Sequence, residues 1–196
     1  PIAMARSEDG FFRATAACGA GTRYKFRLGG REVPDLASRQ QDSDANGWSV
    51  VCEQLAPPPP FSRPWHETVI CEIHVGAATP EGAFAALARR LEHFGAAGYT
   101  CLELMPVNEF PGTRNWGYDG TLVFAPEAAY GTPEELRDLV GRAHELGLSM
   151  ILDVVYNHFG SVDNFAPDYV REWFDEKVST PWGPGINFGE AMVRKF

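Results

Sequence analysis

Three polar side chains that could take part in chemistry follow an apolar run near residue 150. Asp153 lies inside the strand-like segment Ser149–Val155, and Asn157 and His158 come directly after it. An unpaired carboxylate in such a segment would cost several kcal/mol, so Asp153 needs a partner. Carboxylate, amide and imidazole groups together accept and donate the hydrogen bonds that sugar hydroxyls require. The alternative is a structural aspartate that holds loop backbone, with His158 capping the rim.

A second candidate segment is the loop Asn115–Gly120, which contains Trp116, Tyr118 and Asp119. Aromatic rings offer flat apolar faces to the C–H faces of pyranose rings, and their polar edges reach hydroxyl groups. The two glycines of the loop allow the backbone to turn tightly between the rings. The alternative is that Trp116 and Tyr118 only pack the loop against the rest of the fold.

Two further residues carry a weaker signal. His74, near the end of the apolar segment Val69–Val75, is interpreted as a core histidine with satisfied hydrogen bonds rather than as part of a cleft. Trp182 either offers a platform to a sugar ring or anchors its own loop, and the anchor is the favoured interpretation.

The elements that must position these residues begin after residue 65. Apolar runs of strand length occupy Val69–Val75, Thr100–Met105 and Ser149–Val155. Between them, Glu81–Phe94 has apolar residues at helical spacing, with Thr79-Pro80 as its expected start. A second helix is expected from Thr132-Pro133-Glu134-Glu135, because Thr suits the cap and Pro the first position, and Gly147 should end it.

Strands that alternate with helices predict a parallel sheet covered by helices, and we expect the three strands to be adjacent in chain order. The segment after the first strand, His74–Gly82, lacks the glycine-rich pattern of dinucleotide or phosphate loops, so a (β/α)8 barrel is the favoured α/β fold. A complete barrel usually needs about 250 residues, more than this chain has. In a barrel, function lies at the C-terminal ends of the strands, where both candidate segments fall.

The first third of the sequence differs in pattern from the rest. Residues 1–56 contain short strand-like runs at Thr22–Leu28 and Trp48–Cys52, with Gly29-Gly30 as a turn signal, and they predict part of a β-sandwich. Residues 57–65 include a run of four prolines and should form a stiff spacer. We place a domain boundary there, with residues 66–196 forming the barrel part.

Composition and charge exclude several classes of partner. The 196 residues carry a net charge of −9, which repels nucleic acid and anionic membranes. The four cysteines show no metal-ligand spacing and no disulfide framework. No apolar run is long enough for a membrane span, and no secretion signal is recognisable, so we expect a cytoplasmic protein. We also expect no metal and no cofactor.

The candidate residues lie within longer motifs that resemble a known family. Asp153–His158 (DVVYNH) is similar to the first signature region of the α-amylase superfamily, and Glu103–Gly160 resembles its malto-oligosyltrehalose trehalohydrolases. Glycogen branching and debranching enzymes are near relatives of that group. The segments EIHVG at 72–76, PWGPGINF at 181–188 and PDLASR at 34–39 fit the same resemblance.

The resemblance implies a domain arrangement and a role for each candidate residue. Residues 1–56 would be the C-terminal part of an immunoglobulin-like β-sandwich resembling a carbohydrate-binding module, and residues 66–196 would hold barrel strands one to three. Tyr118 would stack on the glucose before the scissile bond, His158 would hydrogen-bond its primary hydroxyl, and Asp153 would support the site from below. Trp116 and Asp119 are further candidates for substrate binding. Asn157 matches a calcium-binding position of some amylases, but its expected role here is structural.

The resemblance also implies that no catalytic residue lies in this chain. Enzymes of this family use carboxylates on strand four, on strand five and after strand seven, beyond the three strands expected here. We therefore expect an α-glucan oligosaccharide as substrate of the parent protein and an inactive fragment that needs the remainder of its own polypeptide. The alternatives are a fragment of a glycogen branching or debranching enzyme, or a non-catalytic glucan-binding module.

Overall fold

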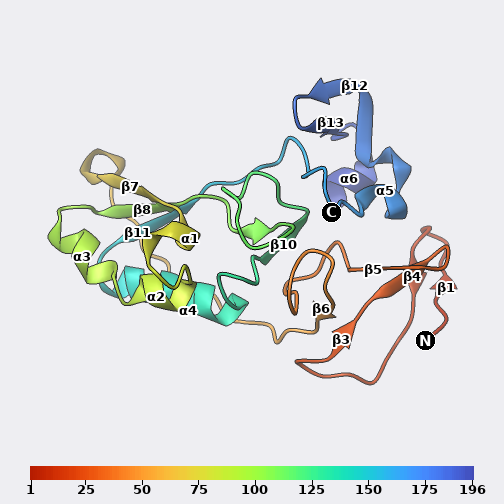
Figure 1. The fold of residues 1–196 in the computed structure, drawn as a ribbon, viewed down its shortest axis with the longest axis horizontal. Coiled ribbons are helices and arrows are strands. Elements are labelled where there is room, and N and C mark those ends of the chain that lie inside the picture. Colours follow the sequence, from red (N-terminus) through yellow and green to blue (C-terminus); the bar gives the residue numbers. More distant parts are fainter.

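The computed structural model describes the backbone of residues 1–196 and every side chain except that of Glu176. The molecule is elongated, with a three-stranded sheet and its helices at one end (Figure 1). Short strands from the beginning and from the end of the chain gather at the other end (Figure 1). The loops that follow the sheet's strands lie between these two regions.

The central sheet consists of β7 (Ile70–Ile73), β8 (Cys101–Leu104) and β11 (Ser149–Leu152). Both pairings are parallel, and β8 lies between β7 and β11, so the predicted topology is confirmed. The first and third strands are both shorter than predicted: β11 ends at Leu152, before Asp153, and β7 ends at Ile73 because the chain turns into the short helix α1 (Val75–Ala78) directly after His74. Small residues permit this turn: a Cβ added at Gly76 would come within 2.8 Å of the Tyr130 ring.

The helix predicted over Glu81–Phe94 is two helices, so that prediction was wrong in its continuity and its start. α2 (Phe84–Ala88) and α3 (Leu91–Ala96) are separated at Arg89 and Arg90, where the Arg90 N–H bonds to the Leu87 carbonyl in a tighter turn. The expected start forms a turn instead, because Thr79 accepts a hydrogen bond from the Gly82 N–H through its side chain. Gly82 has a φ of +63°, a conformation that ends rather than begins helical backbone.

The second predicted helix is confirmed as α4 (Pro133–Glu145). Thr132 accepts from the Glu135 N–H, and the Glu135 side chain accepts in return from the Thr132 N–H, which is a complete capping box. Gly147, with a φ of +73°, follows the end of the helix.

Substituting Thr132 with alanine should lower the free energy of unfolding by about 1 kcal/mol, because α4 loses an N-terminal acceptor. Chemical denaturation of the complete polypeptide measures the change. Thr15→Ala, at an exposed coil position, is the control and should leave the midpoint unchanged. Equal effects of the two substitutions would contradict the capping role.

A hydrophobic core lies between the sheet and its helices. Phe84 and Leu87 from α2, Leu139 from α4 and Leu102 from β8 are all fully buried in it. Figure 1 shows α2 and α4 side by side on this face of the sheet. The residues that alternate with the core residues, including Glu72 and Glu103, therefore point to the opposite face.

The N-terminal segment contains short antiparallel pairs. β3 (Arg23–Tyr24) pairs with β6 (Ser49–Val50), and β4 (Phe26–Leu28) pairs with β5 (Arg31–Val33). The predicted turn at Gly29-Gly30 joins β4 to β5, with φ values of +54° and +89° that glycine adopts without strain.

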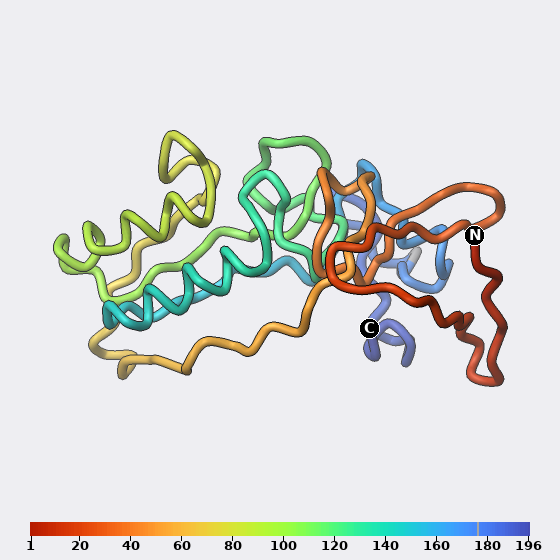
Figure 2. The backbone as a smooth tube through the Cα atoms, turned by 90° about the horizontal axis from the view of Figure 1, so that it is seen from below, coloured from red at the N-terminus to blue at the C-terminus, as the bar shows by residue number. Residues whose placement is uncertain are grey.

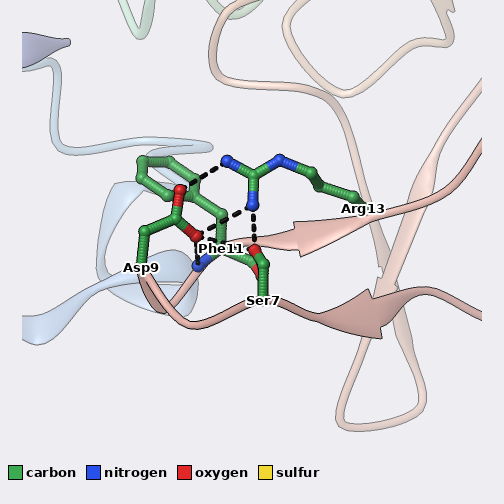
Figure 3. A network of polar contacts seen from close by, with 4 residues as sticks. All are labelled: Ser7, Asp9, Phe11 and Arg13. Carbon is green, nitrogen blue, oxygen red and sulfur yellow. Dashed lines mark hydrogen bonds and ion pairs between the residues drawn. The ribbon is translucent and has the colours of Figure 1, made fainter.

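A further hairpin, β1 (Ala5–Arg6) with β2 (Phe12–Arg13), begins the chain. Figure 3 shows its polar network, in which Ser7 and Arg13 both bond to the Asp9 carboxylate. These hydrogen bonds, first that of Ser7 and then that of Arg13, lower the pKa of Asp9 to about 2. The network fixes the turn of a hairpin that is otherwise exposed.

The proline-rich segment 57–65 lies along the outer side of α4. Figure 2 shows it, in orange, running the length of that helix before η1 (Trp65–Glu67). The Pro59 carbonyl lies 2.8 Å from Nδ1 of His144, and Arg63 donates to the Gly147 carbonyl at 3.0 Å. The segment is thus attached to the helix rather than free of it.

The rest of the chain extends the loops at the carboxyl ends of the strands. These elements are β9 (Asn108–Glu109), β10 (Leu122–Pro126), α5 (Ala166–Tyr169), η2 (Arg171–Trp173), β12 (Phe174–Thr180), β13 (Gly183–Ile186) and α6 (Ala191–Lys195). A second hydrophobic core joins them to the N-terminal segment, with Val33 and Leu36 beside Leu122, Phe165 and Trp173. None of the helices in the described chain combines the length and the apolar character that crossing a bilayer requires.

Candidate functional site

A cleft of about 1240 Å³ lies at the carboxyl ends of the three parallel strands. Its walls come from the chain after β7, from the loop between β9 and β10, from the chain after β11, and from the β12–β13 turn. The side chains that matter below are His74, Trp116, Tyr118, Asp119, His158 and Trp182. Loops after three neighbouring strands therefore meet at one site.

Tyr118 is fixed in this cleft by Asp153. Its hydroxyl donates to Oδ2 of Asp153 at 2.8 Å, and this hydrogen bond raises the pKa of Tyr118. Asp153 in turn extends the pairing of β11, because its N–H donates to the Leu104 carbonyl. Asp153, for which the sequence alone gave no partner, thus holds the Tyr118 ring from the end of the sheet. The action of either residue on a ligand stays a prediction.

His158 lies beside Tyr118 and is only 5% exposed. Its Nε2 is 3.0 Å from the Tyr118 carbonyl oxygen, and its Nδ1 is 2.9 Å from Oδ1 of Asn157. Both ring nitrogens already have partners inside the protein, so a hydrogen bond to a sugar hydroxyl would replace one of these contacts. The predicted role of His158 in sugar binding therefore remains a prediction.

Trp182 covers one face of the His158 ring. The two rings are stacked, with centroids 5.2 Å apart and planes 20° apart. The indole is nevertheless 55% exposed at the edge of the cleft. It therefore has the contacts of an anchor, while part of the indole stays open at the cleft.

The loop that holds Trp116, Tyr118 and Asp119 is shaped by local hydrogen bonds. Nδ2 of Asn115 donates to Asp119 at 3.0 Å, and Oδ1 of Asn115 accepts from the Gly117 N–H at 2.7 Å. Trp116 is 74% exposed, so it does not pack the loop onto the sheet and its helices. Its ring is available at the cleft, whereas Asp119 is engaged within the loop.

His74 differs from its interpretation as a core residue. It is half-buried and lines the cleft, because β7 ends at Ile73 and leaves His74 at the rim. Its Nε2 lies 2.7 Å from the Asn115 carbonyl, while Nδ1 finds no partner among the described residues. The hydrophobicity of Val69–Val75 gave no sign of where the strand would end.

Two buried carboxyl groups were missed in the sequence. Glu109 and Glu127 are each 0% exposed and lie at the base of the loop that carries Tyr118. The available signal was their position beside apolar residues, Phe110 for Glu109 and Ala128 for Glu127. Such neighbours are common for surface glutamates in short strands as well, so the pattern did not distinguish them.

Nothing in the described part of the chain resembles a metal centre. No group of three or more His, Cys, Asp or Glu side chains is arranged there to hold an ion. The four cysteines, Cys18, Cys52, Cys71 and Cys101, are free thiols.

Comparison with known proteins places this geometry in a family. Residues 36–182 match the model of the α-amylase catalytic domain. A malto-oligosyltrehalose trehalohydrolase of Saccharolobus solfataricus is 39% identical over 98% of this chain and 36% of its own length. One of Deinococcus radiodurans is 38% identical over 95% of this chain and 32% of its own length. The chain thus spans about a third of the length of these curated relatives.

A solved structure agrees with the sequence match. The crystal structure of a candidate alpha amylase from Salmonella typhimurium superposes with a TM-score of 0.91 at 40% identity, covering 98% of this chain and 34% of that one. The parallel sheet with its cleft at the strand ends is accordingly part of an α-amylase-type barrel. On the family match and this superposition together, the chain belongs to the α-amylase family.

Proposed function

We propose that the polypeptide containing this chain releases trehalose from malto-oligosyltrehalose, and that this chain supplies one wall of the substrate cleft. The observation that carries the proposal is the Tyr118 ring, which Asp153 fixes beside His158 in a cleft at the strand ends. The identity with trehalohydrolases over nearly the whole chain supports this substrate among α-glucans.

In this proposal the cleft binds sugar through stacking and hydrogen bonds. The Tyr118 face stacks on a glucose ring, and its hydroxyl stays on Asp153. His158 exchanges one of its internal contacts for the primary hydroxyl of that sugar. Trp116 offers a second apolar face, and Asp119 supports the loop through Asn115.

The proposal assigns bond cleavage to carboxyl groups outside the three strands described here. Retaining hydrolysis needs two carboxyl groups about 5 to 5.5 Å apart across the glycosidic bond. Asp153 and Asp119 hydrogen-bond to Tyr118 and Asn115, and both are given a supporting role in the cleft rather than that of nucleophile or acid. The remaining strands of the same barrel would supply the pair.

The division of the chain is part of the same proposal. Residues 1–56 form the C-terminal part of an immunoglobulin-like β-sandwich, residues 57–65 a linker, and residues 66–196 the first part of the barrel. The antiparallel pairs β3–β6 and β4–β5 support the sandwich. The four free thiols suit a reducing compartment, which supports a cytoplasmic location.

Tyr118→Ala in the complete polypeptide should lower kcat/KM for malto-oligosyltrehalose by roughly 5- to 150-fold. This range follows from ring stacking worth about 1 to 3 kcal/mol, by analogy with aromatic stacking on nucleic acid bases. Trehalose release is measured by chromatography at several substrate concentrations. Tyr156→Ala is the matched control, because that ring is 62% exposed and does not line the cleft. An unchanged constant for Tyr118→Ala would show that the ring only packs its loop.

The product distinguishes the proposal from its alternatives. Trehalose as the released product supports the proposed hydrolase. New α-1,6 branches formed from linear glucan would identify a branching enzyme, and loss of such branches a debranching enzyme. Glucan binding without any change in the glucan would indicate a binding module.

A further inference from the structure

Two fully buried glutamates lie at the base of the site loop, by which we mean residues 110–121. Glu109 is the last residue of β9 and directly precedes the loop, and Glu127 follows β10, which begins directly after the loop. Glu109 pairs with Leu122 across the two strands, and its carbonyl accepts from the Thr121 N–H. Any change in this pair therefore acts on both ends of the loop that carries Trp116 and Tyr118.

Each carboxyl group accepts a hydrogen bond from the backbone residue that directly follows the other glutamate. Oε2 of Glu109 accepts from the Ala128 N–H at 2.9 Å, next to Glu127. Oε2 of Glu127 accepts from the Phe110 N–H at 3.2 Å, next to Glu109, and its Oε1 accepts from the Ala129 N–H at 3.0 Å. This reciprocal arrangement closes the base of the loop with side chains where the β9–β10 ladder is irregular.

The charges around Glu109 and Glu127 require that one of the two carboxyl groups is protonated. None of the ion pairs among the described side chains includes Glu109 or Glu127. The charged group that acts on both is another acid, Asp44, and the neighbouring Tyr130 stays neutral because burial and Glu127 raise its pKa to about 12. Two buried like charges cannot both remain ionised.

The hydrogen bonds indicate which glutamate carries the proton. Both oxygens of Glu127 accept backbone N–H groups, as a carboxylate does. Oε1 of Glu109 is buried and meets no donor among the described groups, which suits a protonated oxygen that donates to Glu127. Burial first, and then repulsion by Glu127, raise the pKa of Glu109 to about 9.

We propose that Glu109 and Glu127 are positioning residues that share one proton and hold the site loop in the conformation of this structure, which we call closed. They act through the loop and do not touch the substrate. The consequence for catalysis rests on the proposed function, because the loop matters to turnover only if Tyr118 binds the sugar. The closure itself can be measured without any substrate.

The shared proton makes closure depend on pH in a defined direction. Glu109 has a raised pKa in the closed state and an ordinary one near 4.5 once exposed, so the closed state binds more protons between these values. Closure is strongest below the exposed value and weakens as the pH rises toward about 9. For one proton, the equilibrium constant for opening should rise about tenfold per pH unit in this range.

Hydrogen–deuterium exchange of the complete polypeptide tests this between pH 6 and 8.5. After correction for intrinsic exchange rates, protection of the site-loop amides should fall about tenfold per pH unit in the unmodified protein. Glu109→Gln keeps an N–H donor toward Glu127 and has no proton to lose, so its loop protection should be independent of pH. Glu145→Gln, at an exposed glutamate on α4, is the matched control and should keep the original slope.

A second variant tests the assignment of the proton. Glu127→Gln replaces one accepting oxygen by an amide that cannot accept from a backbone N–H, so loop protection should fall at every pH. A pH-independent loop in the unmodified protein, or a Glu109→Gln variant that keeps the slope, would overturn the proposal. Protection that survives in Glu127→Gln but is lost in Glu109→Gln would reverse the two roles and overturn the assignment.

The pH profile of kcat/KM links closure to the proposed function. We expect kcat/KM to decline at alkaline pH, and this decline to move to higher pH in Glu109→Gln. Together with the exchange result above, this supports both proposals. If the exchange result is as expected but no trehalose is released at any pH, the proposed function is wrong, whereas the proposal that Glu109 and Glu127 hold the site loop is retained.

Discussion

On the proposed function, replacing Gly117 with alanine should reduce kcat/KM of the complete polypeptide for malto-oligosyltrehalose by on the order of 100-fold. Gly117 has a φ of +93°, which costs an alanine roughly 1 to 2 kcal/mol. An added Cβ would also overlap the Pro106 carbonyl oxygen, which is backbone and cannot rotate away. Overpacking of this kind typically costs about 1 to 3 kcal/mol more, and the loop would relieve it by moving Tyr118 off Asp153.

The chain provides a matched control for this substitution. Gly112 has a φ of +86° in the same loop, but an added Cβ there meets nothing within 4 Å. Gly112→Ala shares the conformational cost without the collision, so steady-state kinetics should show a much smaller loss. Similar losses for the two variants would mean that backbone conformation, and not contact with Pro106, fixes the loop.

Phe84→Ala should lower the free energy of unfolding by about 3 to 5 kcal/mol. Phe84 is fully buried at the start of α2, where its ring packs edge-on against Tyr130 at 5.9 Å. Tyr130 also contacts His74 and the Asn115 carbonyl, so the cavity left by Phe84 lies beneath the wall of the cleft. Urea denaturation followed by circular dichroism measures the loss.

Phe12→Ala is the control for the core substitution. That phenylalanine is 59% exposed on the β1–β2 hairpin, so its removal should change stability by less than about 0.5 kcal/mol. A loss below about 1 kcal/mol for Phe84→Ala would show that the core collapses around the vacated space.

The sheet and α4 were predictable because their signals are local. The order of β7, β8 and β11 follows from three apolar runs separated by helical patterns, and Thr132 with Glu135 gives a capping box within four residues. The break between α2 and α3 was not predictable, because Arg89 and Arg90 are both good helix formers. The tighter turn there is set by packing and not by propensity.

The candidate site was predictable in its members but only partly in its contacts. The strand-end rule placed Tyr118, His158 and Asp153 together, and the structure brings them into contact. The Glu109–Glu127 pair was not predictable, because two glutamates share a proton only when distant segments bury both. The internal partners of His158 depend likewise on a backbone carbonyl from another loop, which sequence spacing does not reveal.

The second hydrophobic core has a consequence for how the protein is made. It joins the N-terminal segment to the last elements of the chain, and Tyr169 donates to the Pro34 carbonyl across 135 positions. At ribosomal rates of about 5 to 20 residues per second, Val33 and Leu36 wait on the order of 10 s for their partners to emerge. During synthesis the N-terminal segment therefore exposes apolar surface until the later elements emerge, and a chaperone would cover this surface in the interval.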